Sequence, residues 1–330
     1  MQTINANYTR WIQCDPSVTD VRTANAEYLK THAFTHDQIC PVLHLKLTTR
    51  IGSKSSYGEV FRYVPPNSSA VFALKIVPNF YYDPEEVRVT QILSDLNIPY
   101  IVKQYAHGEC PTIQLNKDSY LLREQPAETT TISGHYIFSE MLAMDFTSYL
   151  IKCIEDPGNW KEHTCNILKA IMTIVENVSD LEHMSIKKLY TKPGVFHNDL
   201  HIGNVMFRCN RNGEAEIVFI DFGKVANEQS TVMINHHGTV GFFIYSLLSV
   251  LDQGWGPTCQ VHVHIDGKLT CMSREVTHAQ GYDTLFSALD YLYTAFLPFY
   301  VDKETGEMSQ SAANEIRWKI DEMIDQIQQI

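Results

Sequence analysis

Two polar clusters in the second half of this sequence carry side chains suited to proton transfer and metal binding. HNDLHIGN (197–204) sets histidines, an aspartate and asparagines between apolar neighbours, and IDFG (220–223) ends an apolar run with a carboxylate. Asp199 can accept a proton from a hydroxyl group, while Asn204 and Asp221 offer the oxygen ligands that Mg²⁺ prefers. A proton acceptor beside a divalent cation supplies two of the parts that phosphoryl transfer requires, and a clamp on the phosphates is the third.

Two further clusters, in the first half, are suited to holding phosphates. Gly52 and Gly58 frame the stretch IGSKSSYGEV, in which the small Ser55 and Ser56 keep bulky side chains away. Glycines allow the backbone to approach a phosphate closely. Lys75 stands among apolar residues in FALKIV. A cation at that place can hold two phosphate groups of a nucleotide.

The four clusters together resemble the protein-kinase superfamily, whose motifs run from a Gly-rich loop through V-A-I-K and H-R-D-L-x-x-x-N to D-F-G. Here they stand in the same order as GSKSSYGEV, FALK, HNDLHIGN and DFG, and the resemblance covers about residues 45–225. It implies a bilobal α+β fold. A small β-rich N-lobe (45–140) and a larger α-helical C-lobe (141–330) would follow an N-terminal extension (1–44), with Mg·ATP between the lobes.

The resemblance also implies a role for each matching residue of the catalytic set. Asp199 would be the catalytic base, acting with Lys75 and Asn204. Lys75 would bind the α- and β-phosphates of ATP, and Asn204 and Asp221 would hold Mg²⁺.

The remaining nucleotide contacts follow from the same resemblance. Backbone groups of Glu140 and Leu142, in FSEML, would bind adenine, and Asp145 would reach the ribose. The residues expected to cover the nucleotide are Gly52, Ser55, Ser56 and Gly58 in the loop, with Val60 against the adenine.

The sequence departs from the family at the glutamate that pairs with the lysine. Its expected place falls on Val89, whereas Glu85 and Glu86 lie about one helical turn earlier. We expect Glu86, rather than Glu85, to pair with Lys75. The middle glycine of the loop is also replaced.

The catalytic loop departs from the family at two positions. Asn198 replaces the usual arginine, so activity is not expected to depend on a phosphorylated activation loop. His201 replaces the usual lysine, and DLHxGN is also similar to haspin-like kinases and to aminoglycoside and choline phosphotransferases. Asp283 is the candidate for the helix aspartate that braces this loop.

These features favour transfer of phosphate from ATP to serine or threonine hydroxyls of a protein substrate. The alternative enzyme is a small-molecule phosphotransferase, which we favour less because SSYGEVF resembles a protein-kinase loop. The non-enzymatic alternative is a nucleotide-binding pseudokinase scaffold, which the displaced glutamate and altered glycine loop keep open.

Composition limits the other classes of function. The 330-residue chain is 44% hydrophobic and 19% charged, which is typical of a globular protein with a large core. Its net charge of −12 makes a broad nucleic-acid-binding face unexpected. The longest apolar run, 240–251, is shorter than the roughly 20 residues that span a bilayer, and it predicts a buried helix.

The cysteines and the start of the chain bear on location. Eight cysteines show no C-x-x-C pair, and the start lacks the pattern of a secretory signal. We expect reduced thiols and a cytoplasmic or nuclear monomer without a membrane span.

The elements that must position these clusters follow from hydrophobic periodicity. Strands are expected at 43–52, 58–64, 70–77, 101–109, 135–142 and 214–223, with a loop at about 109–134. Helices are expected at 23–34, 83–96 and 165–184, with further helical structure from Asp145 onward.

The last part of the chain leaves two alternatives open. Cys259, His262, His264 and Cys271 lie in or near an expected hairpin (260–272), with His262 opposite Cys271. A zinc site with His278 is possible there, but a half-buried hairpin face is favoured. The terminal helix carries a stripe of apolar residues (Ile316, Ile320, Met323, Ile327, Ile330), which predicts packing in the C-lobe rather than dimerisation.

Overall fold

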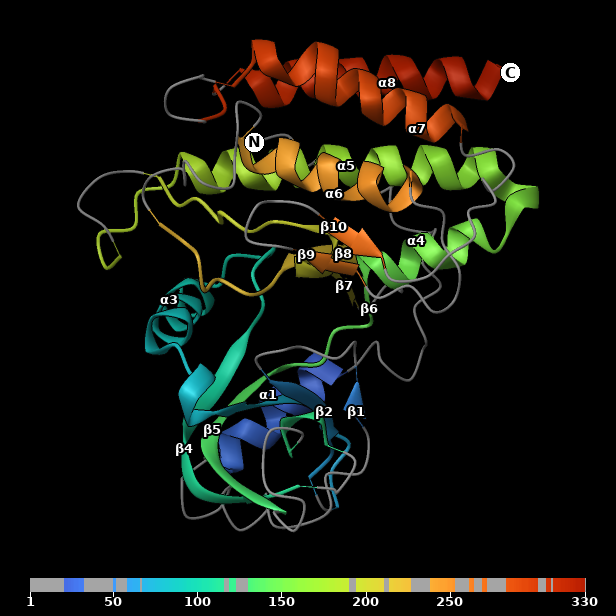
Figure 1. Cartoon of the computed structure of the whole chain (residues 1–330). Helices are drawn as coiled ribbons and strands as arrows, with labels where there is room; N and C mark the ends of the chain where they lie inside the picture. The colour runs from blue at the N-terminus through green and yellow to red at the C-terminus, as the bar shows by residue number, and fades with distance from the viewer. Residues whose placement is uncertain are drawn as a thin grey trace. The chain divides into compact units, whose positions relative to one another are not determined.

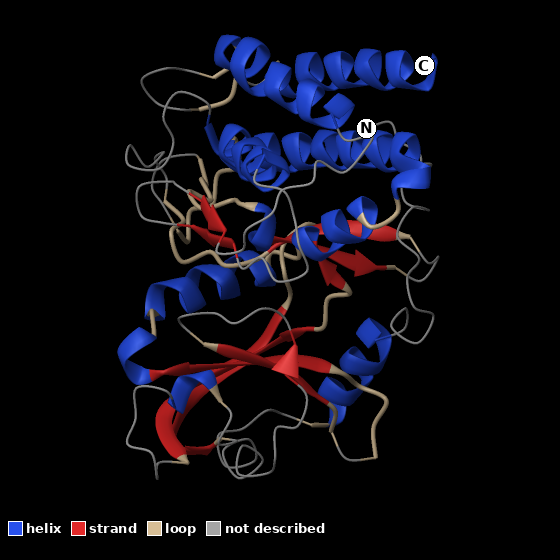
Figure 2. Ribbon diagram, turned by 45° about the vertical axis from the view of Figure 1, so that its right-hand side comes forward, coloured by secondary structure: helices blue, strands red, loops and turns tan. Residues whose placement is uncertain are grey.

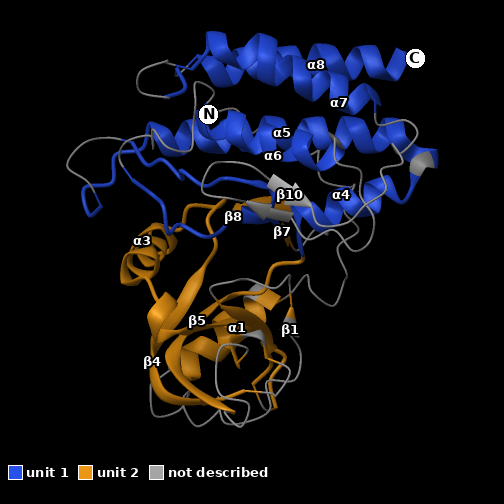
Figure 3. Ribbon diagram, in the orientation of Figure 1, with its two compact units in different colours: residues 1–11, 144–207, 219–330 blue, residues 12–143, 208–218 orange. Residues whose placement is uncertain are grey.

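The computed structural model forms two compact units. The first comprises residues 1–11, 144–207 and 219–330, and the second comprises residues 12–143 and 208–218 (Figure 3). The structure describes residues 21–32, 50–51, 58–65, 67–115, 119–122, 130–189, 194–210, 214–226, 238–252, 261–263, 269–271, 283–301, 307–309 and 311–329. Helices and antiparallel strand pairs occur together, in agreement with the α+β class.

Unit 2 is built on a five-stranded antiparallel sheet with the order β1-β2-β3-β5-β4 (Figure 1, Figure 2). Alternating apolar side chains form these strands, since in β3 the buried Phe72, Leu74 and Ile76 share one face. The strands are β1 (Arg50–Ile51), β2 (Glu59–Tyr63), β3 (Phe72–Pro78), β4 (Gln104–Gln114) and β5 (Thr131–Glu140).

The loop expected at about 109–134 is wrong at both ends. β4 continues to Gln114 and β5 begins at Thr131, because Ile113 pairs with Ile132 across the two strands. Ile113 is fully buried, so hydrophobic burial extends the strand pair beyond the polar residues that suggested a loop.

Two helices complete unit 2. α3 (Pro84–Asp95) agrees with the expected helix; the Asp83 side chain caps it by accepting a hydrogen bond from the Glu85 amide at 2.8 Å. α1 (Val21–Thr31) agrees with the helix expected in the N-terminal extension. The Asn25 side chain makes two hydrogen bonds with the backbone of Val71, so α1 belongs to the packed unit.

Unit 1 is mainly helical, as the sequence predicted from Asp145 onward. Its helices are α4 (Phe146–Ile154), α5 (Trp160–Glu182), α6 (Gly238–Asp252), α7 (Asp283–Tyr291) and α8 (Ala312–Gln329). α5 and α8 run side by side (Figure 1), and Arg317 of α8 forms an ion pair with Glu176 of α5 at 3.0 Å.

The apolar stripe of α8 is buried within unit 1. Ile316, Ile320 and Ile327 are buried as expected, but the fourth buried isoleucine is Ile324, whereas Met323 is partly exposed. Packing against α5 therefore accounts for the stripe without a coiled-coil dimer.

Short strands accompany the helices. β6 (Met144–Asp145), β7 (Val205–Cys209) and β8 (Ala215–Phe219) form a sheet in that order, and β9 (Val261–Val263) pairs with β10 (Leu269–Cys271). Before the 197–204 loop, Phe196 makes an isolated β-bridge with Ala226.

The register of the β9–β10 hairpin differs from the expectation. His262 pairs with Thr270, and Cys271 pairs with Val261, so His262 and Cys271 are not opposite each other. A shift of one residue exchanges the two faces of a strand, which removes the geometric basis of the zinc prediction. Cys259, His264 and His278 lie outside the described residues.

Membrane and redox features complete the description. Within the described part of the chain, no helix has the length and apolar character needed to cross a membrane. Cys153 and Cys165 are free and buried, and burial raises the pKa of Cys153 to about 11. Cys110 and Cys209 are disulfide-bonded, so the expectation of reduced thiols is wrong for these two.

Candidate functional site

Hydrogen bonds within the 197–204 loop fix the shape of the loop. The backbone carbonyl of Asp199 accepts two hydrogen bonds, one from the Asn204 side-chain amide at 2.9 Å and one from the His201 amide at 3.0 Å. The Asn204 amide donates in turn to the His201 carbonyl at 2.8 Å. Asp199 and Asn204, five positions apart, are thereby held in one compact turn.

A second set of hydrogen bonds ties this loop to the stretch that contains Asp221. The Ile220 amide donates to the Asn204 carbonyl at 3.0 Å, and His197 donates through Nε2 to the Ile220 carbonyl at 2.9 Å. Asp221 follows in a left-handed conformation, with φ of 61°, and is exposed. The structure therefore brings Asp199, Asn204 and Asp221 together within unit 1.

Two histidines lie in this cluster, His197 buried and His201 partly buried. Burial lowers the pKa of His197, although its hydrogen bond to Ile220 and the charges of Asp199 and Asp221 oppose the shift. Burial also lowers the pKa of His201, against the same two charges. The His197 ring packs on Phe222 at a centroid distance of 4.8 Å, which connects the loop to the DFG stretch.

The Asp199 carboxylate has two unequal oxygens. Oδ2 forms an ion pair with the Lys224 ammonium group at 2.8 Å. Oδ1 is buried and has no hydrogen-bond partner among the described residues. A buried acceptor without a hydrogen bond is energetically unfavourable unless a ligand donates one. This oxygen is therefore suited to accept a hydrogen bond from a hydroxyl group.

The residues available for a metal fit Mg²⁺ better than a transition metal. The described residues contain no group of three or more His, Cys, Asp or Glu side chains that could hold a metal. Mg²⁺ is commonly held by one or two protein oxygens together with phosphate oxygens. Asp221 and the side-chain oxygen of Asn204 match that requirement, because the Asn204 nitrogen is already used by Asp199.

Ser246, which the sequence analysis missed, braces the loop. Its hydroxyl accepts a hydrogen bond from the Ile202 backbone amide at 3.1 Å and donates one to the Phe243 carbonyl at 2.6 Å. Asp283, the residue predicted for this role, is exposed at the start of α7, and its contact with the loop stays a prediction. The available signal was a serine in the otherwise apolar stretch FFIYSLL of α6.

In unit 2 the predicted pair of Lys75 and Glu86 is present. Nζ and Oε1 are 2.9 Å apart, and the side chains are 26% and 22% exposed. Glu85 instead forms an ion pair with Arg88 on the outer side of α3. Val89, where the resemblance would place this glutamate, is buried in the core. The prediction that Glu86 rather than Glu85 pairs with Lys75 is confirmed.

The glycine loop is described only at its end. Gly52, Ser55 and Ser56 lie outside the described residues. A Cβ atom on Gly58 would lie 2.7 Å from the Ile76 carbonyl oxygen, so only glycine fits against β3 there. Val60 stands opposite Lys75 in the register of β2 and β3.

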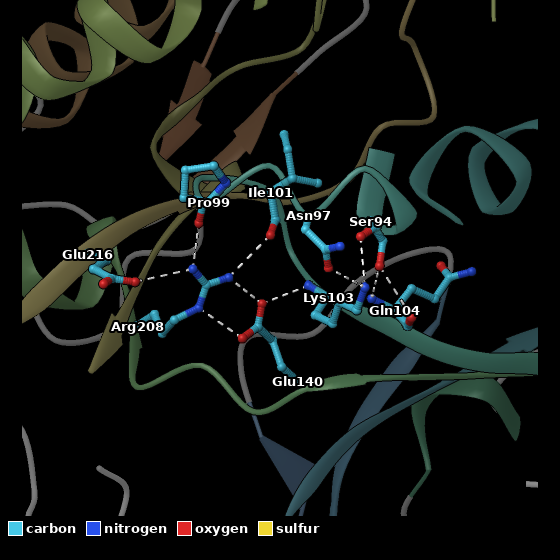
Figure 4. A network of polar contacts seen from close by, with 9 residues as sticks. All are labelled: Ser94, Asn97, Pro99, Ile101, Lys103, Gln104, Glu140, Arg208 and Glu216. Atoms are coloured by element: carbon cyan, nitrogen blue, oxygen red, sulfur yellow. Dashed lines mark hydrogen bonds and ion pairs between the residues drawn. The ribbon is translucent and has the colours of Figure 1, made fainter. Parts of the chain in front are cut away.

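Glu140 is the centre of a buried charged network (Figure 4). It accepts from the Arg208 guanidinium through both carboxylate oxygens and from the Lys103 amide at 2.6 Å. Arg208 also donates to the carbonyls of Pro99 and Ile101. The network fixes the end of β5. Arg208, a charged residue in the apolar run VMFRC, was missed by the sequence analysis.

The other residues expected at the adenine and ribose have structural partners. The backbone amide of Glu140 donates a hydrogen bond to the Lys103 carbonyl at 2.8 Å, so this amide is not available to bind adenine. Leu142 is buried. Asp145 caps α4, accepting the Ser148 amide at 2.7 Å and its hydroxyl at 2.8 Å. A ribose contact by Asp145 would compete with this cap.

Comparison with models of known protein families gives no match for this chain. Comparison with curated protein sequences gives no match either.

Proposed function

We propose that this protein transfers the γ-phosphoryl group of ATP, with Mg²⁺, to serine or threonine hydroxyls of a protein substrate. The observation that carries the proposal is the Asp199 carboxylate. One oxygen is held by Lys224, and the other is buried without a partner among the described residues. A base that is oriented in this way, beside metal-binding oxygens, suits activation of an acceptor hydroxyl.

Each residue then has a defined task. Lys75, held by Glu86, neutralises charge on the α- and β-phosphates, and Asn204 and Asp221 hold Mg²⁺, which neutralises the phosphate oxygens when bound. Asp199 orients the acceptor hydroxyl and takes its proton. In this proposal unit 2 corresponds to the small lobe of a protein-kinase-like fold and unit 1 to the large lobe, and Lys75 and Asp221 are each expected to contribute to nucleotide binding.

Two observations bear on the alternatives. The Lys75–Glu86 pair supports a nucleotide site that is catalytically competent, against a pseudokinase scaffold. The DLHxGN stretch leaves small-molecule phosphotransfer as the second candidate. Cytoplasmic or nuclear location stays a prediction, and the disulfide bonds of Cys110 and Cys209 weigh against it because cytosolic thiols are kept reduced.

The test is a transfer assay with ATP labelled at the γ-phosphate. The purified full chain is incubated with Mg²⁺ and a protein mixture, and separately with amino sugars and with choline. Labelled phosphoserine or phosphothreonine is the expected product. Label on an amino sugar or choline alone would favour the small-molecule enzyme, and nucleotide binding without transfer to any acceptor would favour the scaffold.

A further inference from the structure

Lys224, directly after the DFG stretch, is held in place by the backbone around it. The Val225 amide donates to the Phe222 carbonyl at 3.2 Å, which closes a turn with Lys224 in its centre. The Asn198 side chain donates to the Lys224 carbonyl at 3.1 Å. The Lys224 ammonium group contacts Asp199 at 2.8 Å.

The 197–204 loop has no cation of its own. Its sequence contains neither lysine nor arginine. His201 stands where the resembled family has a lysine, but its Nδ1 atom accepts the Gly203 amide at 3.0 Å. A ring nitrogen that accepts a hydrogen bond carries no proton, so this imidazole supplies no positive charge.

Stability does not account for this arrangement. The Lys224 side chain is 55% exposed, whereas that of Asp199 is 15% exposed. Ion pairs with one partner this exposed contribute little to folding. A turn and a side-chain hydrogen bond nevertheless fix the Lys224 backbone beside the candidate base. The exposed ammonium group retains donors that can reach a ligand, since an ammonium group has three.

We infer that Lys224 is a catalytic residue of the proposed phosphoryl transfer, whose ammonium group contacts the transferring phosphoryl group while it holds Asp199. This inference rests on the proposed function. The acceptor oxygen bonds to the γ-phosphorus, the bond from phosphorus to the β–γ bridging oxygen breaks, ADP leaves with that electron pair, and the acceptor proton passes to Asp199. The ammonium group stabilises negative charge on the transferring oxygens.

The experiment compares wild-type full chain with Lys224→Met, Lys224→Arg and the control Lys187→Met, which changes an exposed lysine of unit 1. Transfer from labelled ATP gives kcat and KM, and calorimetry gives the affinities for Mg·ATP and Mg·ADP. We expect Lys224→Met to lower kcat by roughly 10²-fold, as for loss of one donor to a developing charge. We also expect about tenfold weaker Mg·ATP binding, with Mg·ADP binding unchanged.

Lys224→Arg is expected to recover most of kcat and the preference for ATP over ADP, because it restores the positive charge. A lysine that only positions Asp199 would lower kcat and leave the ratio of ATP to ADP affinities unchanged. That result, or full activity of Lys224→Met, would overturn this inference while leaving the proposed function intact. Absence of transfer by the wild-type chain would instead overturn the proposed function.

Discussion

The protein contains two pairs of a cation and a carboxylate that are built in opposite ways. In unit 2, the side chains of Arg208 and Glu140 are 3% and 1% exposed, and Arg208 also donates to the Pro99 and Ile101 carbonyls. In unit 1, Lys224 and Asp199 are 55% and 15% exposed, and Asp199 Oδ1 has no hydrogen-bond partner among the described residues.

Under the proposed function, this difference separates a structural pair from a catalytic one. Burial alone would lower the pKa of Arg208, but the hydrogen bonds and charge of Glu140 raise it overall, so the guanidinium stays charged inside the protein. All three nitrogens of Arg208 donate to protein acceptors, so none is left for a ligand, and loss of either partner would leave a buried charge unpaired. Asp199 has one oxygen without a hydrogen-bond partner among the described residues, and in the proposed function this oxygen accepts a proton.

Removing the charge of the incomplete pair should abolish activity without unfolding the protein. We expect Asp199→Asn to lower phosphoryl transfer by roughly 10²- to 10⁴-fold, the contribution of a positioned general base. Thermal unfolding of the variant should stay within a few degrees of the wild type. The control Asp325→Asn changes an exposed aspartate of α8 and should keep full activity. Full activity of Asp199→Asn would end the assignment of a base.

Breaking the buried pair of Arg208 and Glu140 should instead destabilise the fold. We expect Arg208→Met to reduce the free energy of unfolding by about 3–5 kcal/mol, because Glu140 would be left buried and unpaired. Denaturant unfolding measures the loss. Arg88→Met breaks an exposed ion pair with Glu85 in the same unit and should cost less than about 1 kcal/mol. Equal losses for the two variants would show that burial does not distinguish these pairs.

A third carboxylate, Glu182 of α5, should make stability depend on pH. It is fully buried, accepts from the Thr239 hydroxyl at 2.7 Å and from the Met308 amide at 3.2 Å, and its burial raises its pKa from 4.5 to about 8. Between these values the native state binds more protons than the unfolded state, so stability falls as the pH rises.

We expect the free energy of unfolding to fall by about 3 kcal/mol between pH 5 and pH 8 because of Glu182. In Glu182→Gln this decrease should largely disappear, whatever constant cost the substitution adds. Glu162→Gln, an exposed residue of the same helix, should retain the decrease. Denaturant titrations at several pH values measure the slope, and an unchanged slope in Glu182→Gln would contradict the assignment.

The pair of Lys75 and Glu86 is intermediate in exposure between the other two pairs. Its loss should have the smallest effect on activity of the changes proposed here. At about one quarter exposure it is partly screened by water. We expect Glu86→Gln to lower kcat/KM for ATP by about tenfold. Glu85→Gln, one position earlier, should change it by less than twofold. A larger effect of Glu85→Gln would mean that Glu85 is the functional partner.

The elements of the fold were largely predictable because their signals are local. α3 follows from its Asp-Pro-Glu-Glu start and α5 from the helical spacing of its apolar residues. The pairing of Glu86 with Lys75, eleven positions apart, was instead predicted from the resemblance and the position of Glu86 on the expected helix. Strand register was less predictable, since a shift of one residue at His262 leaves the pattern of the hairpin almost unchanged.

The missed residues act through long-range contacts. Ser246 braces Ile202 from 44 positions away, and Arg208 pairs with Glu140 across 68 positions. A serine in an apolar helix and an arginine in an apolar strand are each unusual, but a single sequence does not say which partner satisfies them. Burial of a polar side chain requires such a partner, and only the fold identifies it.

The proposed function predicts that Lys75 and Asp221 both contribute to the binding of Mg·ATP. Calorimetric titration of the full chain with ATP in the presence of Mg²⁺ tests it most directly, on wild type, Lys75→Met and Asp221→Ala. We predict that the wild type binds and that each substitution weakens binding at least tenfold, the loss of one charge-assisted contact. Wild-type affinity in both variants, or no binding by the wild type, would contradict the claim.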